Sequence, residues 1–254
     1  MKINDQKSVY NQDKVVFLGY QISLNQIQPK HSRAQGIIDF HIPSTKKELH
    51  SFLGLINFDR DFIPGFSDLA KPLYDILHDS NKHLVWSSEA QQIFDKIKNF
   101  WSNELILHIP DPKIKYTLEL DASDVWLGCS LRQEGRPIFH ISRVLKKAEK
   151  NYSITEKELL AAKWGMERLK YYLIGKEFDL ITDHKALEAL RHKKDFGNAR
   201  MERWMDFFSQ FNLKIIYRQG SQNIGADALS RNISTPREAD MNDKDLMEKF
   251  YDFM

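Results

Sequence analysis

The hydrophobic pattern of this 254-residue chain changes near Pro110, and this change restricts the possible folds more than any other feature. Before Pro110, apolar residues recur at the spacing of amphipathic helices. After it, short segments of alternating apolar and polar residues predict half-buried strands. The chain therefore combines a helical module, at about residues 30–105, with a second unit that contains a sheet.

The helical module has clear start and stop signals. Pro43 precedes a helix start at which Thr45 and Glu48 have the spacing of a capping box, and Pro64-Gly65 ends that helix. The predicted helices are Lys30–Phe40, a helix from Thr45 to about Phe62, Ser67–His78, and a helix from Ser87 or Ser88 to about Trp101.

A hairpin is predicted before this module. Val15–Ile22 has the composition of one strand, and Leu24–Ile27 that of a turn into a short second strand.

The second unit alternates strands and helices. The predicted strands are Lys115–Asp121, Trp126–Leu131, Arg136–Ser142, Glu177–Thr182 and Leu213–Arg218. The predicted helices are Ile154–Leu173, Lys185–Arg191, Ala199–Phe208 and Ala226–Ser230. Three meander strands followed by alternating helices and strands predict the α/β (α+β) class, with a mixed sheet and helices on its faces.

Composition excludes several classes of protein. Cys129 is the only cysteine, so a disulfide framework and a cysteine-rich zinc site are excluded, and its apolar surroundings favour a small buried side chain. The net charge of +2 argues neither for nor against a nucleic-acid partner. We find no signal peptide and no apolar segment near the ~20 residues of a membrane span, so we expect a soluble protein that is not secreted.

Two aspartates stand at the ends of predicted strands. Asp121 closes the strand Lys115–Asp121, and Asp183 directly follows the strand Glu177–Thr182. Ligands bind outside the carboxyl ends of strands that have parallel neighbours, so both side chains are candidates for a binding site. The alternative is that each aspartate only ends its strand, because aspartate favours turns.

A third acid, Glu158, is placed by helix phase. It falls on the same face of the predicted helix as Ala161, Ala162 and Gly165, whose small side chains suit close packing on a sheet. A carboxylate on such a face is unfavourable unless it is paired or bound to a metal. Glu158 could instead complete a capping box with Thr155, although Ser153 and Glu156 offer an alternative box that leaves Glu158 free.

The fourth acid, Asp227, opens a short predicted helix, where the helix dipole alone favours an acid. It becomes a candidate ligand only together with Asp121, Glu158 and Asp183. Four carboxylates brought together cannot all stay ionised without a cation, and hard divalent ions such as Mg²⁺ prefer oxygen ligands. Such a cluster indicates two-metal phosphodiester chemistry.

Eight short segments carry a resemblance to a known family. In chain order they are Val16–Tyr20, Glu48–Phe66, Ala70–Leu73, Leu120–Ser123, Tyr152–Ala161, Thr182–Leu187, Tyr217–Gly220 and Ala226–Arg231. With these motifs, residues 1–231 resemble the Pol polyprotein of gypsy-type LTR retrotransposons. One departure is Leu120 before Asp121, where many relatives have threonine.

The resemblance implies a division of the chain. Residues 1–42 would be the end of a reverse transcriptase palm with a primer-grip-like hairpin, and 43–110 the thumb and connecting helices. Residues 111–231 would be a ribonuclease H-like domain with a mixed five-stranded sheet, followed by a polar tail at 232–254. The palm motif Tyr-x-Asp-Asp is absent from the sequence. We therefore expect a fragment, or a truncated reading frame, that does not polymerise DNA alone.

The resemblance also implies the site residues. Asp121, Glu158, Asp183 and Asp227 match the four metal-binding catalytic acids of the family, which hold two Mg²⁺ ions, with Mn²⁺ as a substitute. Asp121 would bridge the ions, with Glu158 and Asp183 on one and Asp227 on the other. Expected contacts to nucleic acid come from Leu18, Gly19, Tyr20, Ser123, His184 and Arg218. Weaker candidates for phosphate contacts are Lys193, Lys194, Arg200 and Arg203.

The implied function is metal-dependent endonucleolytic cleavage of the RNA strand of RNA–DNA hybrids. The implied partners are the hybrid and the rest of the Pol polyprotein, without a membrane, in the cytoplasm (in a virus-like particle) or in the nucleus. Two alternatives remain: a non-catalytic module that binds nucleic acid, and an interaction protein whose polar tail docks on a partner.

Overall fold

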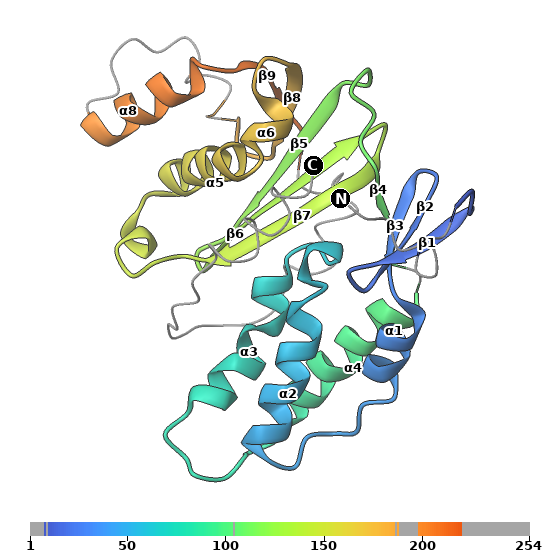
Figure 1. Cartoon of the computed structure of the whole chain (residues 1–254). Coiled ribbons are helices and arrows are strands. Elements are labelled where there is room, and N and C mark those ends of the chain that lie inside the picture. The colour runs from blue at the N-terminus through green and yellow to red at the C-terminus, as the bar shows by residue number, and fades with distance from the viewer. Residues whose placement is uncertain (1–7, 9, 104, 186, 188–197, 220–254) are drawn as a thin grey trace.

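The computed structural model describes residues 8, 10–103, 105–185, 187 and 198–219. Two sheets and a helical module make up the described part of the chain (Figure 1). The first sheet is antiparallel, with the order β1-β2-β3-β4. Its strands are β1 (Lys14–Phe17), β2 (Tyr20–Ser23), β3 (Gln26–Pro29) and β4 (Leu107–His108).

The segment predicted as one strand, Val15–Ile22, is two strands joined by a tight turn. Leu18 and Gly19 both adopt positive φ angles, of 47° and 84°, which reverse the chain between β1 and β2. Glycine adopts this conformation without a steric penalty, so Gly19 was the sequence signal for the turn. The single-strand prediction was therefore wrong.

The helices between β3 and β4 in the chain form a compact module around one apolar core. They are α1 (His31–Ile38), α2 (Lys46–Asn57), the short 3₁₀ helix η2 (Arg60–Phe62), α3 (Phe66–His78) and α4 (Ser88–Ser102). Phe52 and Phe94 meet at the centre of the core, with ring centroids 4.6 Å apart. The Thr45 hydroxyl accepts the Glu48 N–H as expected of an N-cap, but the Glu48 carboxylate accepts from the N–H of Ser44, so the predicted box is shifted by one residue.

One charged pair is buried in this module. Asp59 follows α2 and is 0% exposed, and its Oδ1 lies 3.0 Å from Nη1 of Arg33 on α1. The guanidinium of Arg33 also stacks over the ring of Phe58, 4.0 Å from its centroid. Burial raises the pKa of Asp59 to about 6, and the charge of Arg33 opposes that rise.

The second sheet is the predicted mixed sheet, with five strands in the order β7-β6-β5-β8-β9. Neighbours β5, β6 and β7 are antiparallel, whereas β5–β8 and β8–β9 are parallel. The strands are β5 (Tyr116–Ala122), β6 (Trp126–Gln133), β7 (Arg136–Val144), β8 (Glu177–Thr182) and β9 (Asn212–Tyr217). The predicted fold class is confirmed, including the hairpin turn at Glu134-Gly135, where both φ angles are positive.

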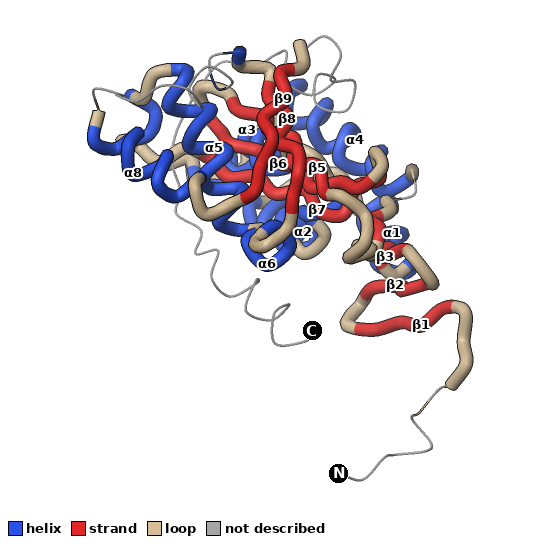
Figure 2. The backbone as a smooth tube through the Cα atoms, turned by 90° about the horizontal axis from the view of Figure 1, so that it is seen from above, coloured by secondary structure: helices blue, strands red, loops and turns tan. Residues whose placement is uncertain are grey.

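Helices α5 (Ile154–Arg168), α6 (Lys170–Leu173) and α8 (Ala199–Phe208) accompany this sheet. Seen from above, α5 and α8 lie together on one side of the strands, and the β1–β2 hairpin projects at the far end (Figure 2). The predicted helix Ile154–Leu173 is interrupted at Leu169, which no glycine or proline marks in the sequence. The predicted helices Ala226–Ser230 and most of Lys185–Arg191, and the tail 232–254, lie outside the described residues.

Small residues set the distance between α5 and the sheet, as the sequence predicts. Ala161 and Ala162 are 0% exposed, and the Cys129 thiol donates to the carbonyl oxygen of Ala161 at 3.4 Å. A Cβ atom on Gly165 would lie 2.4 Å from the sulfur of Cys129. Only glycine therefore fits at this contact, and the helix is held close to β6.

Polar contacts join the helical module to the second sheet. The Ser67 N–H at the start of α3 donates to the Ser142 hydroxyl on β7 at 3.0 Å, and Arg60 donates to the Ser142 carbonyl oxygen at 2.6 Å. Beside them, Gly65 lies against the indole ring of Trp126. Across the described ranges, every helix is too short or too polar to span a lipid bilayer.

Candidate metal centre

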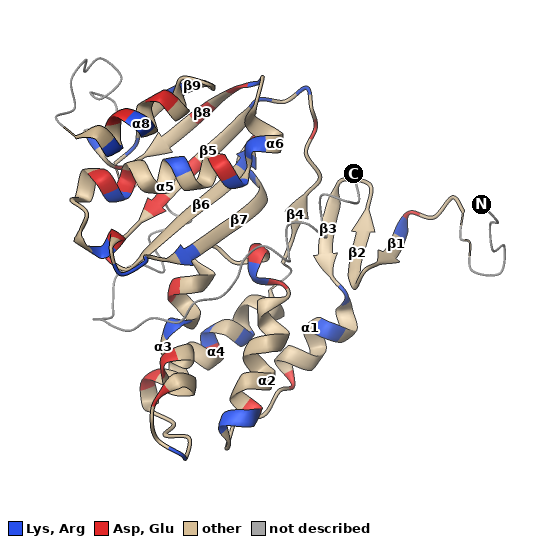
Figure 3. Cartoon of the chain, turned by 60° about the vertical axis from the view of Figure 1, so that its left-hand side comes forward, with Lys and Arg blue, Asp and Glu red and all other residues tan. Residues whose placement is uncertain are grey.

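Glu158 is free to face the sheet because Glu156, two residues earlier, completes the cap of α5. The Ser153 hydroxyl accepts the Glu156 N–H, and the Glu156 carboxylate accepts the Ser153 N–H at 2.9 Å, so the capping box is formed by these two residues and not by Thr155. Acidic and basic residues follow one another along the α5 ribbon (Figure 3). Glu158 instead points inward and is 6% exposed.

The surroundings of Glu158 disfavour its charged form. Burial is the largest cause, and the negative charges of Asp183 and Asp121 add to it, so that the pKa of Glu158 rises to about 8. A hydrogen bond from the Thr182 hydroxyl opposes this rise. The carboxylate oxygen Oε2 is buried and, in the described part of the chain, has no hydrogen-bond partner.

Asp121 and Asp183 are brought level by the parallel pairing of β5 and β8. The first four residues of β5 pair with the residues 62 positions later, from Tyr116 with Phe178 to Glu119 with Ile181. Continued by two residues, the same offset aligns Asp121 with Asp183, which directly follows β8. Asp183 directly follows β8, as predicted, and Asp121 is the penultimate residue of β5, so both acids lie at the carboxyl ends of their strands.

The end of β8 is fixed by Thr182. This residue is 0% exposed, its hydroxyl oxygen accepts the backbone N–H of His184 at 3.0 Å, and its carbonyl oxygen accepts the N–H of Arg218 at 2.9 Å. The Thr182 side chain also lowers the pKa of Glu158. Thr182 therefore fixes the backbone directly before Asp183, a role that the sequence patterns did not indicate.

A pocket lies beside Asp121, and Leu120, Cys129 and Ser130 belong to its lining. The pocket is also lined by the corner Pro64-Gly65 of the helical module, by Trp126 and by Gly128. No sequence pattern indicated this long-range approach of the helical module to Asp121.

The donor chemistry fits a hard divalent cation, but the coordination sphere is incomplete. Three carboxylates interact, and one buried oxygen of Glu158 has no partner in the described part, which is the pattern that a cation would relieve. Within the ranges described, however, no three His, Cys, Asp or Glu side chains converge closely enough to hold a metal ion. The fourth predicted ligand, Asp227, lies outside the described residues.

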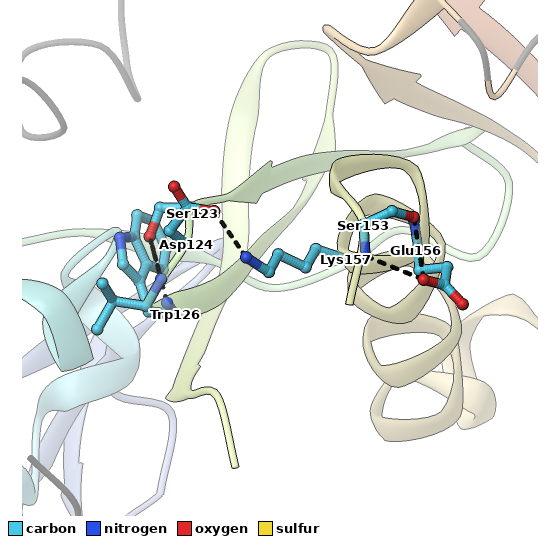
Figure 4. Close-up of polar contacts among 7 residues, drawn as sticks. Ser123, Asp124, Trp126, Ser153, Glu156 and Lys157 are labelled. Carbon is cyan, nitrogen blue, oxygen red and sulfur yellow. Dashed lines mark hydrogen bonds and ion pairs between the residues drawn. The ribbon is translucent and has the colours of Figure 1, made fainter. Parts of the chain in front are cut away.

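Several predicted contacts to nucleic acid have structural partners. The Ser123 hydroxyl accepts the N–H groups of Val125 and Trp126, each at 3.2 Å, inside the turn between β5 and β6 (Figure 4). The Arg218 guanidinium donates to Glu119 at 3.2 Å, with 38% of its side chain exposed. Arg200 pairs with Glu156 and stacks 3.9 Å from the ring centroid of Tyr152. The contacts themselves stay predictions, and Lys193 and Lys194 lie outside the described residues.

The hairpin residues predicted to contact nucleic acid do not lie beside the carboxylates. Leu18, Gly19 and Tyr20 belong to the first sheet, next to the helical module. The Tyr20 hydroxyl donates to the Phe58 carbonyl oxygen at 3.3 Å, and a Cβ on Gly19 would collide with the guanidinium of Arg33. Leu18, at the tip of the turn, is 63% exposed. The hairpin is thus anchored on α1 and α2, with Leu18 facing solvent.

Comparison with known proteins places these features in a family context. The family model described as "RNase H-like domain found in reverse transcriptase" matches residues 111–211. The chain is 38% identical over 231 residues to the Pol polyprotein of transposon 297 of Drosophila melanogaster, covering 91% of this chain and 22% of that protein. It is 35% identical to the Pol polyprotein of the transposon gypsy of the same fly, covering 91% and 23% of the two chains.

A fungal relative gives a similar result. The Transposon Tf2-3 polyprotein of Schizosaccharomyces pombe is 35% identical over 237 residues, covering 90% of this chain and 18% of that protein. The chain thus spans about a fifth of the length of the curated relatives it matches.

Among solved structures, the foamy viral protease-reverse transcriptase is similar in two complexes. With dsDNA, the TM-score is 0.69 at 23% identity, covering 85% of this chain and 47% of that chain. With an RNA/DNA hybrid, the TM-score is 0.69 at 22% identity, covering 93% of this chain and 33% of that chain. At these identities, the likeness shows a common fold.

Proposed function

Because this chain is a segment of the gypsy- and Tf2-type retrotransposon Pol family and carries its RNase H-like domain, we propose that it cuts the RNA strand of RNA–DNA hybrids. One observation carries the proposal. The buried carboxylate of Glu158 lies within the electrostatic reach of Asp121 and Asp183, at the carboxyl ends of two parallel strands. That is the edge of a sheet where ligands bind, and a group of carboxylates there suits divalent cations, which prefer oxygen ligands.

In the proposed mechanism, Asp121, Glu158 and Asp183 would hold the cations together with Asp227. Bound Mg²⁺ would supply activation of the attacking water and charge stabilisation at the departing 3′ oxygen. Thr182 lowers the pKa of Glu158 and so favours the charged carboxylate that binds a cation. Arg218, held by Glu119 and partly exposed, would contact a backbone phosphate.

Selectivity for the hybrid would come from the RNA strand. A wide, shallow minor groove presents 2′-hydroxyl groups, which DNA lacks, and these are the groups that let a protein distinguish RNA from DNA. The polymerase motif Tyr-x-Asp-Asp is absent from the sequence, so the proposed activity is cleavage and not synthesis. Synthesis, and association with the remainder of a Pol polyprotein, would belong to a longer protein.

The test uses the full 254-residue chain and an RNA–DNA hybrid labelled on the RNA strand. With Mg²⁺, we expect internal cleavage of the RNA strand and no cleavage of duplex DNA of the same sequence. Asp183→Asn should remove cleavage while leaving the protein folded. The matched control is Asp179→Asn on β8, the strand that Asp183 follows. The Asp179 carboxylate pairs with Lys115 at 2.7 Å, and this variant should cut like the wild-type protein.

Two results would contradict the proposal. If the folded wild-type protein cuts no hybrid with either Mg²⁺ or Mn²⁺ but binds it, the chain is a binding module without catalysis. If it neither cuts nor binds, the remaining function is an interaction with another protein.

A further inference from the structure

The turn between β5 and β6 follows Asp121 directly and is closed by its own side chains. Besides the two amides that its hydroxyl accepts, Ser123 donates its backbone N–H to the carbonyl oxygen of Trp126 at 2.9 Å. These bonds give the turn an internal shape. They do not fix its position relative to α5, which carries Glu158.

One ion pair spans the space between this turn and α5. Nζ of Lys157 lies 2.6 Å from Oδ1 of Asp124, and Figure 4 shows the lysine side chain extended from the helix toward the turn. The two partners differ in exposure: the side chain of Lys157 is 9% exposed and that of Asp124 is 81% exposed.

The burial of Lys157 is not explained by stability alone. Removing an ammonium group from water is unfavourable, and a partner that faces solvent compensates for it only in part. An apolar side chain of similar length would fill the same space without that penalty. The burial also keeps Lys157 from contacting a nucleic-acid backbone while it is paired. What the charge adds is a directional link to Asp124.

That link connects the neighbours of two candidate ligands. Asp124 is three residues after Asp121, and Lys157 directly precedes Glu158. Elsewhere, α5 meets β5 and β6 through small and apolar side chains, such as those around Cys129. Such contacts hold the helix near the sheet, but they set its position along the strands less strictly than a charged hydrogen bond does.

We propose that Lys157 is a positioning residue that, through Asp124, fixes the carboxylates of Asp121 and Glu158 relative to each other and so sets the affinity for the divalent cation. This inference rests on the proposed function, because it assumes that these carboxylates bind the metal. Residues that orient metal ligands typically change metal affinity by ~10–100-fold when they are replaced. We therefore expect an effect of about tenfold.

The test measures Mn²⁺ binding to the full chain by calorimetry, without substrate. Lys157→Met keeps the length of the side chain and removes its charge, and Asp124→Asn removes the charge of its exposed partner. Each should weaken Mn²⁺ binding about tenfold. The double variant should be no weaker than either single variant, because both remove the same link. Lys157→Arg should retain most of the affinity.

The matched control lies on the same helix. Lys163 pairs with Glu167 at 2.7 Å and lies over the ring of Phe207 on α8, so Lys163→Met should leave Mn²⁺ binding unchanged. A cleavage assay adds a second readout. In Lys157→Met, excess Mg²⁺ should restore kcat, and KM for the hybrid should not change. A lost contact to the nucleic acid would instead raise KM at every Mg²⁺ concentration.

Two outcomes would overturn the inference, and they differ in what else they overturn. If the wild-type protein binds Mn²⁺ and cuts hybrid, and folded Asp124→Asn and Lys157→Met bind Mn²⁺ equally well, Lys157 has no positioning role and the proposed function stands. If the wild-type protein neither binds Mn²⁺ nor cuts, the proposed function fails and this inference fails with it.

Discussion

The helical module and the mixed sheet each bury one carboxylate, and they do so differently. In the module, Asp59 is 0% exposed but has the guanidinium of Arg33 at 3.0 Å, and its pKa rises only to about 6. In the sheet unit, Glu158 is 6% exposed and its pKa rises to about 8. Within the described part of the chain, no Lys, Arg or His contributes to the pKa of Glu158, and two other carboxylates do.

The difference separates a structural acid from a candidate functional one. A buried charge that is paired can be explained by the packing of the protein, as for Asp59 between α1 and α2. A buried carboxylate flanked by like charges raises the free energy of the folded state, so a role outside folding is the better explanation. The missing positive charge next to Glu158 is what we assign to a divalent cation.

The largest effect that sharpens this comparison is the pH dependence of stability. Because the pKa of Glu158 rises from 4.5 to about 8 on folding, its contribution to stability is complete below pH 4.5 and is lost as the pH rises toward 8. The loss is at most about 5 kcal/mol. Urea unfolding of the metal-free protein between pH 5 and pH 9 measures it. In the variant Glu158→Gln, the free energy of unfolding should not show the fall that ionisation of Glu158 causes over this pH range.

Mg²⁺ separates the two acids in the same experiment. It should restore stability at pH 9 in the wild-type protein but not in Glu158→Gln. Asp59 loses its smaller contribution between about pH 4 and pH 6, and Mg²⁺ should leave that part of the curve unchanged. An equal effect of Mg²⁺ on the wild-type protein and on Glu158→Gln would break the comparison.

A smaller effect is expected when the paired acid loses its partner. Arg33→Met leaves Asp59 buried without a positive charge, which should lower the free energy of unfolding by about 3 kcal/mol. The same variant should bind Mn²⁺ with wild-type affinity, because Arg33 belongs to the helical module. A calorimetric titration measures the Mn²⁺ affinity of this variant. A loss of Mn²⁺ binding by the folded variant would show that Asp59 and Glu158 are not independent.

The smallest effect concerns Glu156, two residues before Glu158 on the same helix. Arg200 and the Ser153 cap lower the pKa of Glu156 to about 2, so its contribution to stability is present above pH 4.5 and is lost as the pH falls toward 2. Glu156→Gln should destabilise the protein at pH 7 by about 1 kcal/mol and leave cleavage intact. Thermal unfolding and the hybrid assay measure the two outcomes; reduced cleavage would contradict the assignment of Glu156 to the cap alone.

The sequence predicted the parts of this arrangement that depend on local periodicity. Alternation located β5 to β7, and helix phase placed Glu158 on the inner face of α5. Two local features escaped this reasoning. Leu18 takes a left-handed conformation that its side chain does not favour, and β4 has only two residues, too few to produce a pattern.

Long-range contacts could not be predicted from the sequence. The hydrogen bond from Ser67 to Ser142 and the ion pair between Lys157 and Asp124 join residues on separate elements. No spacing in the sequence encodes such contacts, because they depend on how α5 lies on the sheet. Asp227, which local reasoning supported least, lies outside the described residues, and its role stays a prediction.

The most direct measurement of the central claim is the titration of Glu158 itself. Carboxyl carbon NMR of the full chain, with and without saturating Mg²⁺, follows Glu158 and Asp59 in the same sample. We expect Glu158 to titrate near pH 8 without metal and well below its ordinary value with Mg²⁺, while Asp59 does not respond to the metal. A pKa of Glu158 that Mg²⁺ does not change would contradict the claim that this acid binds the cation.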